Sequence, residues 1–175
     1  MMWVVGMTGG IGCGKSAASE AFARRGVSIV DSDVISRELT GPGGSAIQAI
    51  RQEFGDEVIT ENGALDRDRM RERVFSDPTA KKKLEAILHP VIRSESDRLS
   101  ELAQSPYVIQ VIPLLFEIGM GNEDFNRILV IDCSEDMQIA RVMARSALPE
   151  DEIHKILRSQ VDRSTRLARA DDVLV

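Results

Sequence analysis

The stretch Gly9-Gly10-Ile11-Gly12-Cys13-Gly14-Lys15-Ser16 decides the fold of this chain. It matches the pattern G-x-x-x-x-G-K-[ST], which forms a loop that holds phosphate groups. The apolar run Trp3–Met7 precedes it, and strong helix formers follow from Ala17 to Arg25. The pattern requires this order of strand, loop and helix. The sequence therefore predicts a nucleoside triphosphate site, in preference to a glycine-rich turn that matches by chance.

Each residue type in the loop has a physical role. The glycines allow backbone conformations in which successive N–H groups turn inward around a phosphate, and the following helix points its partly positive N-terminus at the same anion. Lys15 adds a movable positive charge that can follow the β- and γ-phosphates, and the Ser16 hydroxyl can ligate Mg²⁺. Cys13 is predicted to be a small residue that supplies its N–H. A thiol at a helix N-terminus can be reactive, which leaves oxidative sensitivity as a minor hypothesis.

The composition is that of a globular protein without a broad positive surface. The 175 residues carry a net charge of −6, and 43% of them are hydrophobic. An acidic chain argues against non-specific binding to nucleic acid or to anionic membranes, and no apolar run is long enough to span a bilayer. The two cysteines form neither a disulfide framework nor a metal-ligand spacing. The first strand follows Met1 too closely for a targeting peptide, so we expect a cytoplasmic protein.

Strand-like and helical patterns alternate on both sides of a purely helical middle. We expect strands at 3–7, 27–30, 107–112, 127–132 and 172–175. We expect helices at 17–25, 34–39, 46–54, 67–75, 79–88, 135–145 and 150–160, and one more that ends at about 104. His89-Pro90 should separate that last helix from 79–88, because the residue before a proline avoids helical geometry. Alternating buried strands and helices predict an α/β fold, with a parallel sheet covered by helices on both faces.

Asp31 and Asp33 follow the second expected strand, at the sheet edge where ligands of such folds bind. A carboxylate there can orient a substrate hydroxyl toward the γ-phosphate and accept its proton during transfer. Either aspartate could instead cap the helix that starts at Val34. We expect both uses, with Asp33 as the base.

Arg141 and Arg145 lie four residues apart, on one face of their expected helix. Two guanidinium groups there could fold over the phosphates as a lid and neutralise the charge that spreads during transfer. A solvated basic face accounts for the same spacing equally well. Arg163, Arg166 and Arg169 lie further along, and at least one of them could serve the same pocket.

In its combination of motifs the chain resembles the dephospho-coenzyme A kinase family. The matching pieces occur in the family's order: Met7 to Ser16, Asp31-Ser32-Asp33 with Arg37, Leu88-His89-Pro90, Pro113-Leu114-Leu115-Phe116-Glu117, Arg141 with Arg145, Gln160, Arg166-Leu167 and Ala170-Asp171-Asp172-Val173. They spread over nearly the whole chain. The phosphate loop alone is generic, whereas its combination with the His-Pro and Pro-Leu-Leu-Phe-Glu pieces is specific.

The resemblance implies ATP-dependent phosphorylation of the ribose 3′-hydroxyl of dephospho-coenzyme A, the last step of coenzyme A synthesis, with Mg²⁺ as cofactor. It also implies a single kinase domain of the P-loop NTPase type, built in three parts. The nucleotide core would span about 1–40 and 105–175, a helical substrate-binding region about 41–104, and a lid about 141–165. The helical middle of the sequence agrees with this division.

The family roles, together with the loop pattern, give an expected site. The expected ATP-binding residues are Gly9, Gly12, Cys13, Gly14, Lys15, Ser16, Ala17 and Arg145. The expected catalytic residues are Asp33, Lys15 and Arg141, and Ser16 is the expected metal ligand. The expected substrate-binding residues are Asp33, Arg37, His89, Leu115 and Glu117. A lone histidine beside a proline is more often structural, so His89 is given a binding or architectural role and no catalytic one.

Two departures from the family pattern matter. Ala17 stands where the family often has a threonine, so one hydroxyl near the phosphates is missing. The family continues past the last strand with an asparagine-containing turn and a helix, whereas this sequence ends at Val175. We therefore expect an incomplete adenine pocket, and lower activity or stability than in a chain extended at this end.

Three other interpretations compete with this one: another kinase of the same broad class, a nucleotide-dependent switch, and a structural relic of the loop. The retained Lys15, Ser16 and Asp33 argue against a relic. Kinases of the same fold that act on shikimate, gluconate or a nucleotide share the loop, the acidic residue and the arginine lid, but lack the His-Pro and Pro-Leu-Leu-Phe-Glu pieces. A guanine-nucleotide switch would carry Asn-Lys-x-Asp and Asp-x-x-Gly segments, and the sequence has neither. Nothing in the sequence predicts the oligomeric state.

Overall fold

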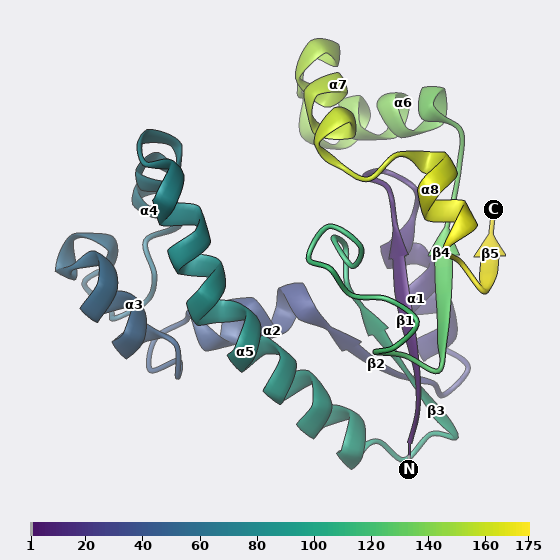
Figure 1. The fold of residues 1–175 in the computed structure, drawn as a ribbon, viewed down its shortest axis with the longest axis horizontal. Helices are drawn as coiled ribbons and strands as arrows, with labels where there is room; N and C mark the ends of the chain where they lie inside the picture. The colour runs from purple at the N-terminus through teal and green to yellow at the C-terminus, as the bar shows by residue number, and fades with distance from the viewer. Residues whose placement is uncertain (1) are drawn as a thin grey trace. The chain divides into compact units, whose positions relative to one another are not determined.

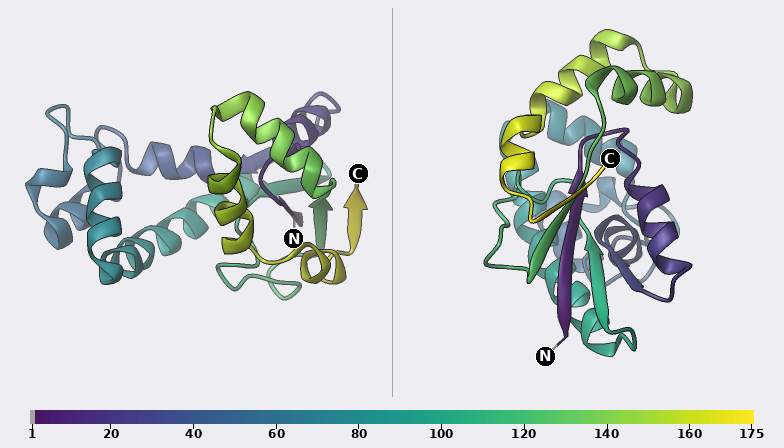
Figure 2. Two further views of the ribbon diagram at one scale, coloured as in Figure 1. Left: turned by 90° about the horizontal axis from the view of Figure 1, so that it is seen from above. Right: turned by 90° about the vertical axis from the view of Figure 1, so that its right-hand side faces the viewer.

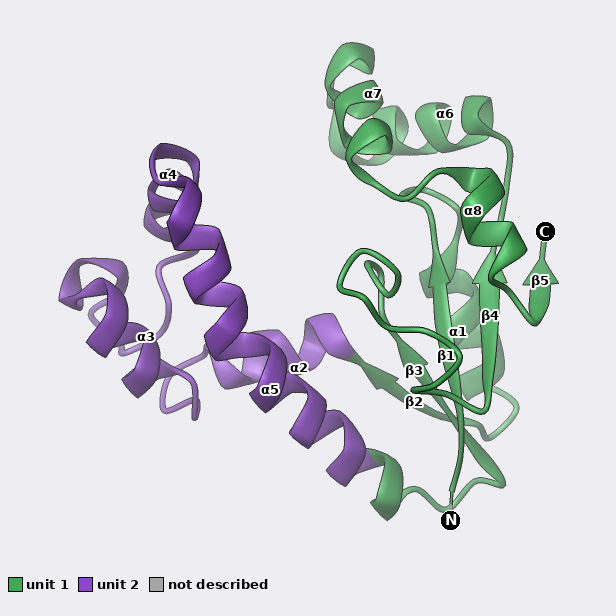
Figure 3. Cartoon of the chain, viewed as in Figure 1, with its two compact units in different colours: residues 1–31, 100–175 green, residues 32–99 purple. Residues whose placement is uncertain are grey.

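The computed structural model describes residues 2–175, which divide into two compact units (Figure 3). We call residues up to 31 together with 100–175 the sheet unit, and residues 32–99 the helical unit. The chain leaves the sheet unit after its second strand and returns to it near the end of a long helix. The helical stretch predicted in the middle of the sequence is confirmed.

The sheet unit is built on five parallel strands in the order β2-β3-β1-β4-β5 (Figure 1). Every pairing between neighbours is parallel. The strands are β1 (Trp3–Gly9), β2 (Ser28–Asp31), β3 (Tyr107–Val111), β4 (Arg127–Ile131) and β5 (Asp172–Leu174). The central position of β1 places the phosphate loop, which follows it directly, at the middle of the carboxyl edge. The predicted α/β fold with a parallel sheet is confirmed.

Adjacent residues of β4 pack into different cores, because successive side chains of a strand point to opposite faces. Ile131 belongs to a buried cluster that includes a residue of α1 (Lys15–Ala23). Its neighbour Val130 belongs to another, against which a residue of α8 (Arg163–Ala168) packs. Helices therefore cover both faces of the sheet, as the right-hand view of Figure 2 shows.

α6 (Glu135–Ser146) and α7 (Glu150–Ser159) follow β4 and contact each other. Ser134 caps α6 by accepting a hydrogen bond from the N–H of Met137. The sequence patterns did not predict α8, which is short. A signal was present, because Asp162 caps α8 through the N–H of Thr165 at 2.9 Å, and aspartate is a favoured cap.

The helical unit contains α2 (Ser32–Leu39), α3 (Ile47–Phe54), the short 3₁₀ helix η1 (Asp56–Val58), α4 (Arg67–Ser76) and most of α5 (Pro78–Leu102). These elements share one buried apolar cluster, to which α3 contributes three residues. None of the helices among residues 2–175 is long and apolar enough to cross a membrane.

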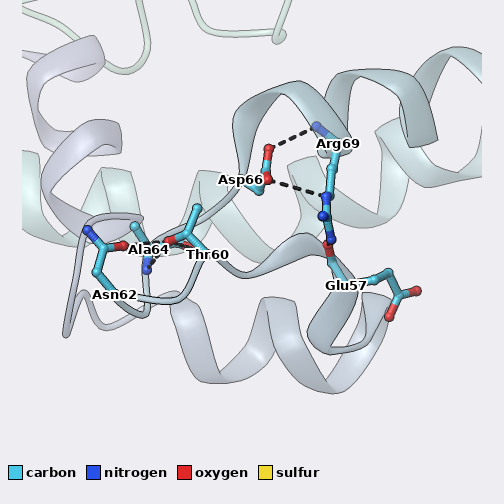
Figure 4. Close-up of polar contacts among 6 residues, drawn as sticks. All are labelled: Glu57, Thr60, Asn62, Ala64, Asp66 and Arg69. Atoms are coloured by element: carbon cyan, nitrogen blue, oxygen red, sulfur yellow. Dashed lines mark hydrogen bonds and ion pairs between the residues drawn. The ribbon is translucent and has the colours of Figure 1, made fainter.

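Short-range hydrogen bonds shape the segment that leads into α4 (Figure 4). The Thr60 hydroxyl accepts from the N–H of Ala64 at 3.0 Å, which closes a turn. Asp66 caps α4 by accepting from the N–H of Arg69 at 3.0 Å. The Arg69 guanidinium in turn donates to the carbonyl of Glu57 at 2.9 Å. All these partners lie within twelve residues of each other in the sequence.

The predicted break at His89-Pro90 is wrong, because α5 runs through Pro90 without interruption. A proline inside a helix removes the hydrogen bond to the carbonyl four residues earlier, which here belongs to Ala86. His89, Pro90 and Ala86 are all exposed, so water can satisfy that carbonyl. The apolar face of α5 contributes Leu84, Ile87, Leu88 and Val91 to the core of the helical unit.

Candidate active site

The phosphate loop connects the end of β1 to the start of α1, beneath α6 in the right-hand view of Figure 2. The N–H of Cys13 donates to the carbonyl of Gly10 at 3.2 Å, which curls the loop. Gly14 starts α1 with a φ of 98°, a conformation that favours glycine. A Cβ built on Gly14 would meet only an Arg141 nitrogen, at 3.7 Å, within 4 Å among the described residues. The turn into α1 is therefore open enough for an anion to approach its N–H groups.

The Lys15 side chain lies back along the loop. Its ammonium donates to the carbonyls of Gly9 at 2.7 Å and Gly10 at 3.1 Å. Ser16 and Ala17 are exposed in the first turn of α1. A positive charge held over a glycine-rich loop, beside an exposed hydroxyl, is a donor set that fits a phosphate chain with Mg²⁺.

Arg141 reaches the phosphate loop, and Arg145 does not take part in the same contact. Arg141 Nη1 lies 3.4 Å from the Gly12 carbonyl and 3.5 Å from the Cys13 carbonyl. One turn further along α6, Arg145 is exposed and donates to the Ser146 hydroxyl at 3.4 Å. The contact places Arg141 beside the loop, and its catalytic role as a lid residue stays a prediction. For Arg145, ATP binding stays a prediction.

A second group of charges lies at the carboxyl end of β4. The buried carboxylate of Asp132 accepts from Arg163 Nη2 at 2.6 Å and Nε at 2.9 Å. The hydrogen bonds from Arg163 lower the pKa of Asp132 and outweigh the effect of burial, which raises it. Arg166 is buried as well, and its Nη2 lies 3.2 Å from the position that a Cβ on Gly10 would take. The sequence patterns left the partners of these groups open.

The predicted substrate-binding residues of the sheet unit have structural partners. Glu117 Oε1 accepts a hydrogen bond from the N–H of Val161 at 2.9 Å, so it anchors the connection between α7 and α8. Leu115 is fully buried in the core cluster that covers β4. Any contribution of Leu115 to substrate binding would therefore come through its backbone.

The remaining predicted residues belong to the helical unit. α2 begins two residues earlier than expected, at Ser32, so Asp33 lies in its first turn, which favours acidic residues. Asp33 and Arg37 are exposed on α2, and His89 is exposed on α5. Asp31 ends β2 in register with Val111 of β3. The roles of Asp33, Arg37 and His89 stay predictions, because the loop and these residues lie in different units.

Cys13 and Cys133 are both buried and lie in contact, with 3.5 Å between their sulfur atoms. Burial raises the pKa of the Cys133 thiol to about 11, and the contact with Cys13 adds to the shift. A buried thiol of raised pKa is a poor nucleophile. The burial of the Cys13 side chain against Cys133 agrees with a passive role for Cys13 in the loop.

Comparisons with known proteins identify the family of this chain. The model of a family described as dephospho-CoA kinase matches residues 3–175. The dephospho-CoA kinase of Aromatoleum aromaticum is 53% identical over 172 residues, which are 98% of this chain and 84% of the relative. That of Thiobacillus denitrificans is 53% identical over 175 residues, 99% of this chain and 86% of the relative.

Solved structures resemble the chain over the same length. A protein from Thermus thermophilus superposes with a TM-score of 0.86 at 31% identity, covering 99% of this chain and 87% of its own. The dephospho-CoA kinase from Campylobacter jejuni gives a TM-score of 0.71 at 27% identity, covering 99% and 88%. With the phosphate loop, the parallel sheet and this similarity over nearly its whole length, the chain belongs to the dephospho-CoA kinase family.

Proposed function

We propose that this chain transfers the γ-phosphoryl group of ATP to the ribose 3′-hydroxyl of dephospho-coenzyme A, giving coenzyme A and ADP. The observation that carries the proposal is the meeting of Lys15 and Arg141 on one glycine-rich loop at the centre of the carboxyl edge, in a chain of this family. Phosphoryl transfer depends on positioning the reactants and on neutralising the charge of the transferred group. Lys15 and Arg141 supply the positive charge for this neutralisation.

Each residue of the proposed site has a separate task. N–H groups of the turn from Gly14 to Ala17 hold the β- and γ-phosphates, Lys15 follows the transferred group, and Arg141 neutralises the charge that develops on it. Ser16 would hold Mg²⁺, which when bound screens the negative charge of the phosphates. Asp33 accepts the proton of the 3′-hydroxyl as the new P–O bond forms.

The test is incubation of the purified chain with ATP, Mg²⁺ and dephospho-coenzyme A. Mass spectrometry should detect the 3′-phosphorylated product, and equimolar ADP should appear. Parallel reactions contain shikimate, gluconate or nucleoside monophosphates as acceptors. Turnover of one of these acceptors without turnover of dephospho-coenzyme A would contradict the proposal. Omission of Mg²⁺ should abolish the reaction.

A further inference from the structure

The peptide groups of Ile11, in the middle of the phosphate loop, are held by two glutamine side chains from distant parts of the sheet unit. The N–H of Ile11 donates to Gln160 Oε1 at 3.1 Å. The carbonyl of Ile11 accepts from Gln138 Nε2 at 2.7 Å. Gln138 lies in α6, and Gln160 directly follows α7. The pair α6–α7 is therefore fastened to a single residue of the loop near each of its ends.

The loop and Gln138 are closely fitted to each other. Gln138 is 4% exposed. A Cβ on Gly10 would lie 2.3 Å from Gln138 Nε2, and a Cβ on Gly12 would lie 2.9 Å from the Gln138 carbonyl oxygen. Position 12, which has a φ of +75°, is therefore limited to glycine by the approach of the α6 backbone. The side-chain amide of Gln138 occupies the space that a side chain at position 10 would fill.

Gln160 is itself held in place. Its N–H donates to the carbonyl of Leu157 at the end of α7, at 3.2 Å. The next residue, Val161, donates its N–H to the Glu117 carboxylate at 2.9 Å. Glu117 follows β3, so the segment that carries Gln160 is tied to the sheet. A side chain supported in this way can fix the peptide that it contacts.

We propose that Gln138 and Gln160 are positioning residues, which hold the phosphate loop in its anion-binding shape and couple α6–α7 to it. A glycine-rich loop has high conformational freedom, so fixing the two peptide groups on either side of the Ile11 Cα lowers the cost of ordering the loop around a phosphate. The Ile11 N–H is bonded to Gln160 and the Cys13 N–H to the Gly10 carbonyl, so neither of these two N–H groups is directed at the donor. The proposal goes beyond the reaction and concerns donor binding alone.

Glutamate substitutions separate the two contacts. In Gln160→Glu the carboxylate still accepts from the Ile11 N–H. In Gln138→Glu the donor is lost, and an acceptor faces the Ile11 carbonyl. Both variants add one negative charge beside the same residue, so each is referred to its own methionine variant, which has similar size and no strong hydrogen bond. At each position the ATP dissociation constant of the glutamate variant is divided by that of the methionine variant. This ratio should be about tenfold larger at position 138 than at position 160.

The matched control is Gln110→Met, which removes another buried glutamine of the sheet unit. Gln110 Nε2 donates to the Ser100 hydroxyl at 3.0 Å, away from the phosphate loop. This variant should lower the melting temperature and leave the ATP dissociation constant unchanged. Gln138→Met and Gln160→Met should raise that constant about tenfold.

Calorimetry with ATP and Mg²⁺ gives the dissociation constants without any acceptor, so the result is independent of the acceptor that the chain uses. Amide hydrogen exchange gives a second readout, because Ile11 should exchange faster in Gln160→Met than in the unchanged chain or in Gln160→Glu. Gln160 is partly exposed, so its variants should fold. Two results would overturn the proposal. One is an equal Glu-to-Met ratio of ATP dissociation constants at 138 and 160, and the other is a loss of ATP affinity in Gln110→Met as large as in Gln138→Met and Gln160→Met.

Discussion

The sheet unit and the helical unit differ in how far apart in the sequence their internal contacts reach. In the phosphate loop, Ile11 bonds to residues 127 and 149 positions away, and Gly12 to one 129 positions away. In the segment before α4, the Thr60–Ala64 and Asp66–Arg69 contacts span four and three positions. The shape of the loop therefore depends on the topology of its whole unit. The helical segment is bonded largely to nearby residues, with Thr40 as a more distant partner of Leu65 and Arg67.

This difference predicts how substitutions in the two units should behave. A change in the sheet unit near the loop should alter donor binding, even where the changed residue lies on a distant element. A change in the helical unit should alter either acceptor chemistry or local stability and leave donor binding intact. The following predictions test this division.

The largest effect is expected from Asp33→Asn in the helical unit. If Asp33 is the base, kcat should fall by about 10²–10⁴, because an amide cannot accept the hydroxyl proton. The KM for ATP should change little, since the donor is held by the sheet unit. Steady-state kinetics with both substrates varied measures this split. A normal kcat would remove Asp33 from the mechanism, and a large rise in the KM for ATP would break the division between the units.

Two glycines give a matched comparison. A Cβ on Gly9 of the sheet unit would lie 2.3 Å from the Ile131 carbonyl oxygen, whereas nothing in the described chain lies within 4 Å of a Cβ on Gly63 in the helical unit. Gly9→Ala should lower the free energy of unfolding by about 3 kcal/mol and weaken ATP binding. Gly63 has a φ of +82°, so Gly63→Ala should cost about 1 kcal/mol through its backbone alone.

Chemical denaturation and ATP calorimetry on both glycine variants check this comparison. Gly63→Ala should bind ATP as the unchanged chain does. Weaker ATP binding in Gly63→Ala than in Gly9→Ala would contradict the expectation that the sheet unit binds ATP.

Asp132→Asn tests a buried charge pair of the sheet unit by its pH dependence. The folded-state pKa of Asp132 is lowered by Arg163, so the ion pair stabilises the fold above the unfolded pKa of about 4. This contribution, about 2 kcal/mol, should disappear as the pH falls through the lowered folded value. Denaturation of the unchanged chain and of Asp132→Asn between pH 7 and pH 2 gives the free energy of unfolding of each. The difference between the two free energies should vanish at low pH. A constant difference would contradict the assignment.

The smallest effect is expected from Asp66→Ala, which removes the cap of α4. The free energy of unfolding should fall by about 1 kcal/mol, the usual cost of losing such a cap. ATP binding should remain unchanged. Asp66→Asn keeps an acceptor for the Arg69 N–H and should recover most of the stability. If the asparagine variant were as unstable as the alanine variant, the cap would not explain the loss.

The sequence was sufficient for what depends on local pattern. The five strands, the phosphate loop and the family could all be inferred, because apolar patterns and motif spacing can be read directly from the sequence. The break at Pro90 was wrong because the exposure of that helix face depends on tertiary packing. α8 was missed because so short a helix carries little periodicity.

Sequence reasoning gave less of the site than of the fold. One of its two interpretations of Arg141 put the guanidinium over the phosphates, and in the structure this group contacts the phosphate loop. It did not find Gln138, or Asp132 as the partner of Arg163. Gln160 was noted as part of the family resemblance, without a role. These contacts join elements far apart in the chain, and spacing carries no information about them.

The long reach of Gln160 also bears on how this protein is made. Synthesis proceeds from the amino end, so residues 9–16 leave the ribosome well before Gln160, which lies 149 positions after Ile11. Between these moments the nascent chain carries its glycine-rich segment without the two amides that fix Ile11. Competence to retain nucleotide should therefore arise only after Gln160 has been synthesised and its segment has docked on the loop.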